Sequence, residues 1–175
     1  KKEIDEKLLP KTIKLLAVLK NKSKMYEEIV ENIRKKIEKY NKRKYEAYQL
    51  LIEILEDYKK LNELSEIRKN KGLSEDETYI YSVTKSTIEE MVKEIKIDED
   101  KIYEVTKAIY NEISPILNKR ESNEFCKELK SKIRLSVIRS IGKLGIPTEK
   151  YREVANRIIE KVTDYYIDIY KECRD

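Results

Sequence analysis

The chain has 175 residues, enough for one domain with a substantial core, and 42% of them are charged. Because 39 Lys and Arg nearly balance 34 Asp and Glu, the formal net charge is only +5, which is typical of an ion-paired surface. Three Gly and three Pro argue against a turn-rich all-β fold, a Walker phosphate loop and a Gly-rich dinucleotide-binding turn. The absence of His excludes Ser-His-Asp triads, Cys-His pairs and His-ligated metal sites.

The cysteines and the absence of long apolar segments indicate where the protein works. Cys126 and Cys173 are too few for a disulfide scaffold or a four-thiolate zinc site, so we expect reduced, incidental thiols. No run approaches the length of a membrane span and no secretory signal is present, so we expect a cytoplasmic protein without membrane association. The first residue is Lys rather than Met, from which we expect a fragment of a longer chain. Lys and Glu are abundant while Gln49 is the single glutamine, and this usage resembles that of hyperthermophiles.

The first 71 residues are predicted to be helical, because Lys11–Lys71 contains neither Gly nor Pro. Pro10 fits the first turn of a helix that runs to about Lys20, and residues 21–23 form a polar break. A nearly heptad stripe follows, interrupted by one lysine: Val30, Ile33, Ile37, Tyr40, Lys44, Ala47, Leu51, Ile54, Tyr58 and Leu61. It predicts a long amphipathic helix or a helical hairpin. Further apolar residues widen the stripe and favour a bundle over a dimeric coiled coil: Tyr48, Ile52 and Leu55.

Gly and capping residues divide the rest of the chain into shorter helices. Gly72 is predicted to end the preceding helix in a left-handed conformation. Ser74 with Glu77 forms a capping box for the next helix, and Ser86 with Glu89 is a second such signal.

Asp98 is a candidate N-cap for a helix whose buried face is expected at Ile102, Val105, Ile109 and Ile113, and Pro115 is expected to limit it. Ser122 is predicted to open the following helix. Its apolar side is Cys126, Leu129, Ile133, Val137, Ile141 and Leu144.

Gly145 is predicted as a C-cap residue and Thr148 as the N-cap of the last helix. The apolar face of that helix is Tyr151, Val154, Ile158, Val162, Tyr165 and Ile169. We therefore predict an all-α bundle of about six to seven helices. Residues 1–175 form a single domain in this prediction, with residues 72–175 packed against the long helical segment 1–71.

The positive charge of the chain is concentrated on one predicted helix. Six of the 39 basic residues and one of the 34 acidic residues lie between positions 127 and 143, so the remainder carries 33 of each. The six are Lys127, Lys130, Lys132, Arg134, Arg139 and Lys143. Helical spacing places Lys132, Arg139 and Lys143 opposite the apolar stripe and the other three in a flanking row. These six are the candidate contact residues for an acidic protein surface or for phosphates, although a solvated face paired with acids on neighbouring helices is the simpler explanation.

Two other clusters have simpler interpretations. Among 13 tyrosines, those at positions 40, 58, 151 and 165 fall on predicted apolar faces, whereas Tyr165, Tyr166 and Tyr170 are interpreted as a possible exposed contact patch. The acids at positions 98–100 suggest a cation site or, more simply, a helix cap favoured by the helix dipole.

Four segments stand out in chain order: Tyr40–Ala47 with Leu50–Glu53, Gly72–Glu77 with Tyr79 and Tyr81, Lys130–Arg139, and Gly145–Lys150. In this order they resemble the C-terminal helical domain of the type I restriction endonuclease R subunit family. They resemble, respectively, the helix before the family's Gly-Leu-Ser turn, that turn with its aromatic run, the basic helix, and the Gly-aromatic-Pro-Pro-Asp turn.

The resemblance implies a domain that docks the R subunit on the methyltransferase and specificity subunits. In the parent subunit, it implies an ATP-dependent DNA translocase and endonuclease that uses ATP and magnesium in other domains. The segment itself is then expected to have no catalytic residues, no metal site and no cofactor. Two alternatives remain: a helical module that binds duplex DNA through its backbone, and a scaffold that self-associates through the stripe from Val30 to Leu61.

Overall fold

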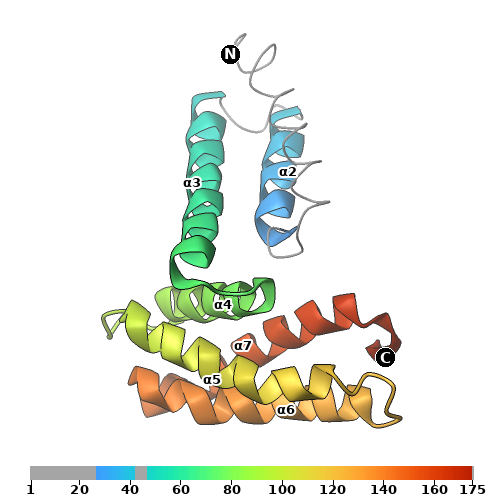
Figure 1. The fold of residues 1–175 in the computed structure, drawn as a ribbon. Helices are drawn as coiled ribbons and strands as arrows, with labels where there is room; N and C mark the ends of the chain where they lie inside the picture. Colours follow the sequence, from blue (N-terminus) through green and yellow to red (C-terminus); the bar gives the residue numbers. More distant parts are fainter. Residues whose placement is uncertain (1–26, 42–46, 175) are drawn as a thin grey trace. The chain divides into compact units, whose positions relative to one another are not determined.

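A computed structural model describes residues 27–41 and 47–174, and this part of the chain contains helices and no strands (Figure 1). The α-helices are α2 (Glu27–Asn41), α3 (Ala47–Lys71), α4 (Glu75–Met91), α5 (Glu99–Leu117), α6 (Phe125–Ser140) and α7 (Thr148–Ile169). Two short 3-10 helices, η3 (Ile141–Leu144) and η4 (Lys171–Cys173), follow α6 and α7. The predicted all-α bundle is therefore confirmed. Within the described ranges, no helix has the length and apolar character needed to cross a membrane.

The chain divides into two compact units, Lys1–Glu75 and Asp76–Asp175. The division lies close to the predicted change from the long helical segment to the shorter helices at residue 72. Whether all 175 residues behave as one domain stays a prediction.

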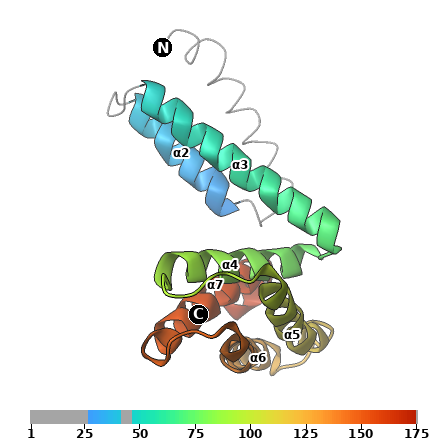
Figure 2. The same ribbon diagram turned by 90° about the vertical axis from the view of Figure 1, so that its left-hand side faces the viewer.

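In the first unit, α2 and α3 pack side by side as a helical hairpin (Figure 2). The stripe predicted from the sequence supplies its core: Val30, Ile33, Ile37, Ile54 and Leu61 are all buried. One buried acid, Asp57, accepts a 2.7 Å hydrogen bond from the Lys36 ammonium across the pair. The structure thus distinguishes the two architectures left open by the spacing and gives the hairpin.

Some predictions for the N-terminal half are wrong or lie outside the described residues. Leu55 does not widen the buried stripe, because its side chain is 56% exposed on α3. Outside the described residues lie the expected features at Pro10, residues 21–23 and Lys44. The side chains of Tyr40, Ala47, Tyr48, Leu51 and Ile52 also lie outside the description.

The junction between α3 and α4 has the predicted local chemistry. Gly72 adopts a φ of +62°, a conformation that costs a residue with a Cβ more than it costs glycine. The Leu73 amide donates to the Arg68 carbonyl at 3.2 Å, which closes a Schellman-type end on α3. Helix α4 begins directly after Ser74. The second start predicted at Ser86 is wrong: α4 continues to Met91, and the Ser86 hydroxyl donates to the Val83 carbonyl within it.

In the second unit, the apolar faces of α5, α6 and α7 form one core with part of α4. All four residues expected to be buried on α5 are buried, and Asp98 caps that helix by accepting from the amides of Asp100 and Lys101. This result supports the cap interpretation of the acids at positions 98–100. Across residues 27–41 and 47–174, no group of three His, Cys, Asp or Glu side chains is placed to hold a metal ion.

Three helix boundaries differ from the sequence prediction. Pro115 does not end α5: it lies inside the last turn, without an N–H for the Asn111 carbonyl, and the helix continues to Leu117. Helix α6 begins at Phe125, and Ser122 instead accepts a hydrogen bond from the Glu124 amide in the preceding turn. Thr148 is the first residue of α7 and makes no cap.

Pro147 occupies the N-cap position of α7, with φ −53° and ψ 137°, the non-helical conformation of a residue directly before a helix. The predicted C-cap position of Gly145 is confirmed: it caps η3, with a left-handed φ of +67°.

The tyrosines near the C-terminus are core residues, so the predicted exposed patch is wrong. Tyr165 and Tyr166 are buried, and their hydroxyls donate to the two carboxylate oxygens of Asp76 on α4, at 2.7 and 3.1 Å. Tyr79 of α4 stacks on the Tyr165 ring with centroids 4.2 Å apart. Burial, and then the neighbouring Asp76 carboxylate, raise the pKa of Tyr166, so its hydroxyl remains a hydrogen-bond donor at neutral pH. Conversely, Ile169 was expected to be buried and is exposed.

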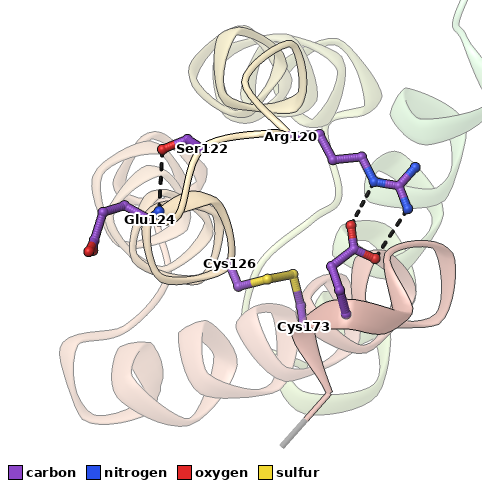
Figure 3. Close-up of a disulfide and its surroundings, with 6 residues drawn as sticks. Arg120, Ser122, Glu124, Cys126 and Cys173 are labelled. Atoms are coloured by element: carbon purple, nitrogen blue, oxygen red, sulfur yellow. Dashed lines mark hydrogen bonds and ion pairs between the residues drawn. A yellow bond between two sulfur atoms is a disulfide. The ribbon is translucent and has the colours of Figure 1, made fainter.

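The cysteines form a disulfide, which corrects the prediction of reduced, incidental thiols. The sequence places Cys126 and Cys173 47 residues apart, but the start of α6 and η4 lie at the same end of the bundle, with the two Cα atoms 5.1 Å apart (Figure 3). Beside the disulfide, Arg120 makes two hydrogen bonds to the Glu172 carboxylate, at 2.6 and 3.1 Å (Figure 3). η4 is therefore joined to the loop before α6 by Arg120 and to the first turn of α6 by the disulfide.

Replacing Cys173 by serine should lower the free energy of unfolding by about 2–4 kcal/mol, because the disulfide restricts a loop of tens of residues in the unfolded chain. Urea unfolding without reductant measures this difference. The wild-type chain in a reducing buffer is the control and should resemble the Cys173→Ser variant, which should itself not respond to reductant. A wild-type unfolding curve that does not change on reduction would contradict this account.

Candidate interaction site

The candidate site is built on α6, whose inner face is fixed by the core. Leu129, Ile133 and Val137 are fully or almost fully buried, as the apolar spacing predicts. α6 packs along α5 on one side and also contacts α7. Because each residue advances about 100° around a helix, burying this face determines which side chains point outward.

Five of the six predicted contact residues lie on α6, and the sixth, Lys143, follows in η3. Lys127, Arg134 and Lys143 are exposed, whereas Lys132 is half-buried. Lys130 is also half-buried and has an interaction of its own.

Arg139 is mostly exposed but already paired. Its guanidinium donates to the Glu112 carboxylate of α5 at 2.7 Å and to the Leu135 carbonyl. The six cations thus lie on one helical segment, but Arg139 forms an ion pair within the bundle.

The face opposite the core is not cationic, which corrects the predicted placement of Lys132 and Arg139. The residues at its centre are Ser131, Leu135 and Ile138, here called the outer stripe. Leu135 is 47% exposed and Ile138 37% exposed. On the helical projection Lys127 and Arg134 flank the outer stripe on one side, and Lys132 and Arg139 flank it on the other. The cations therefore border an apolar strip instead of forming the strip themselves.

A surface hollow of about 390 Å³ lies along the outer stripe. Its lining consists of Ile116 from α5 and six positions on or just before α6: Glu124, Lys127, Glu128, Ser131, Lys132 and Leu135. These six follow the i, i+3, i+4 rule through three turns, so they form one continuous row about 16 Å long. A row of this shape with an apolar floor and charged borders is suited to contact with another helix.

The charge count predicts the cations of this surface but not the apolar residues among them. Leu135 and Ile138 fall outside the apolar stripe predicted for the core of α6, and that position indicates an exposed apolar face. Ile116 had no such signal, because its place beside α6 depends on how α5 and α6 pack.

The ion pair between Arg139 and Glu112 should contribute to stability, whereas Arg134 on the same helix has no ion-pair partner in the described part of the chain. Arg139→Glu should lower the free energy of unfolding by about 1 kcal/mol, because it sets two carboxylates against each other. Arg134→Glu should change it by less than about 0.5 kcal/mol. Adding Glu112→Lys to Arg139→Glu should restore stability. Equal urea midpoints for the two single variants would show that the pair is energetically silent.

Comparison with known proteins assigns the chain to a family. A family model described as Type I restriction enzyme HindI endonuclease subunit-like, C-terminal, matches residues 2–166. Comparisons with curated proteins and with solved structures give no match. Residues 2–166 comprise nearly the whole chain and cover most of both units and the entire candidate site. The chain therefore belongs to the family of C-terminal domains of type I restriction enzyme HindI endonuclease subunit-like proteins.

Proposed function

We propose that this domain docks the R subunit of a type I restriction enzyme on its methyltransferase and specificity subunits, and that α6 with η3 carries the contact. The family assignment supports the type of complex. One observation supports the surface: residues 127–143 hold the entire formal charge excess of the chain, and Lys127, Arg134 and Lys143 within them are exposed.

The mechanism in this proposal is association without chemistry. Exposed cations bring the domain to an acidic partner surface and select its orientation, while apolar contact supplies most of the affinity. In the parent enzyme, ATP and magnesium would serve the motor and nuclease domains and not this one. The chain's own contribution is a rigid helix held in place by Leu129, Ile133 and Val137.

Reversing three exposed cations should weaken docking without unfolding the domain. The variant is Lys127→Glu, Arg134→Glu and Lys143→Glu, and it leaves Arg139 in its ion pair with Glu112. We expect binding to the methyltransferase–specificity core to weaken about tenfold or more at low salt and by less at high salt. Calorimetric titration measures the affinities.

The matched control reverses three exposed cations elsewhere on the second unit: Lys101→Glu, Arg152→Glu and Lys171→Glu. It changes the net charge by the same amount and should bind within about twofold of wild type. Equal weakening by both variants would contradict docking through α6. Salt-steep binding of the wild-type chain to duplex DNA, with no binding to the protein core, would instead support the backbone-binding alternative.

A further inference from the structure

We infer that the outer stripe of α6 receives an amphipathic helix of the methyltransferase–specificity core, with apolar residues along its centre and acidic residues at its borders. This inference rests on the proposed function and names the part of the surface and the chemistry of its occupant. The carrying observation is the arrangement of exposed Leu135 and Ile138 between cations on both sides.

The exposed apolar side chains of the outer stripe favour a partner that also presents apolar side chains. Leu135 and Ile138 are two of the four large hydrophobic side chains that are exposed in the described part of the chain. They are three positions apart and so lie together on one helix face. Beside them, the hollow of about 390 Å³ reaches Ile116 on α5 and can receive apolar side chains from a partner. The row of lining residues extends for three turns, which is the length that a helix with i, i+3, i+4 and i+7 anchors requires.

The charges around the strip specify the borders of the partner helix. Lys127 and Arg134 lie along one border, and Lys132 lies along the other with Glu128 beside it. Acidic side chains on both edges of the partner would find cations, while a neutral or basic side chain would face Glu128. Arg139 lies along the same border as Lys132, but Glu112 of α5 already pairs with it. An occupant with acidic edges and an apolar centre satisfies both features of the site.

A nucleic acid fits the same surface less well. The hollow is also lined by Glu124 and Glu128, whose carboxylates repel the continuous row of phosphates of a nucleic acid, whereas a partner helix can place neutral or basic side chains opposite them. Ser131, Leu135 and Ile138 of the outer stripe provide neither a cation for a phosphate nor an aromatic ring for stacking on a base. Protein is therefore the class of partner that the surface favours.

The test removes the apolar centre and keeps the cations. Leu135→Asp with Ile138→Asp should weaken calorimetric binding to the methyltransferase–specificity core about tenfold or more. The matched control is Leu55→Asp with Ile169→Asp, since these are the other two exposed large hydrophobics, at 56% and 39% exposure. The control should bind within about twofold of wild type. Melting followed by circular dichroism should show that both variants remain folded, because all four side chains are exposed.

A second pair, Leu135→Ser with Ile138→Ser, removes the apolar contact without adding negative charge. It should also weaken binding, although less than the aspartate pair. If the wild-type chain binds the core and both α6 pairs bind equally well, the inference fails while the proposed function survives. If the wild-type chain does not bind the core, the proposed function fails and the inference with it. Salt-steep binding to a duplex DNA probe that the aspartate pair does not affect would overturn the inference in favour of nucleic acid.

Discussion

The candidate site depends on one constraint, which is the packing of the inner face of α6 against the other helices of the second unit. Leu129, Ile133 and Val137 are essentially inaccessible, so α6 cannot rotate without exposing them. That fixed rotation directs Leu135 and Ile138 outward and separates the cations into two borders. The ion pair between Arg139 and Glu112 adds a polar contact between α5 and α6 beside the hollow. A structural core thus determines the chemistry of the exposed face.

A second constraint holds the C-terminal end of the same unit. The Cys126–Cys173 disulfide and the Arg120–Glu172 pair attach η4 to the region where α6 begins. Asp76 holds the hydroxyls of Tyr165 and Tyr166 and so joins the start of α4 to the end of α7. These links secure the end of the unit at which α6 begins and α7 ends.

The sequence predicts which side of each helix is buried, but not which helix packs against that side. On α5, spacing alone identifies Ile102, Val105, Ile109 and Ile113 as core, because an amphipathic helix reports its own buried side. The same spacing cannot say which helix lies opposite, so the Asp76–tyrosine contacts and the disulfide were not predicted. Tyrosine suits either the core or the surface, so the sequence alone does not show that Tyr166 is buried; its contact with Asp76 of α4 places it in the core. Ile169 has the spacing of a core residue but is exposed. For the candidate site, the charge count located the segment, while its apolar centre required knowing how α6 is rotated.

Photo-cross-linking from the outer stripe tests most directly whether it is the docking surface. A photoreactive benzoylphenylalanine placed at position 135 would be irradiated in the presence of the methyltransferase–specificity core, and the cross-linked peptide would be identified by mass spectrometry. The same probe at position 169, also an exposed aliphatic position of the second unit, provides the comparison. We predict a cross-link from position 135 to a helix with acidic borders, and none from position 169. Cross-linking from position 169 and none from position 135 would contradict docking through α6.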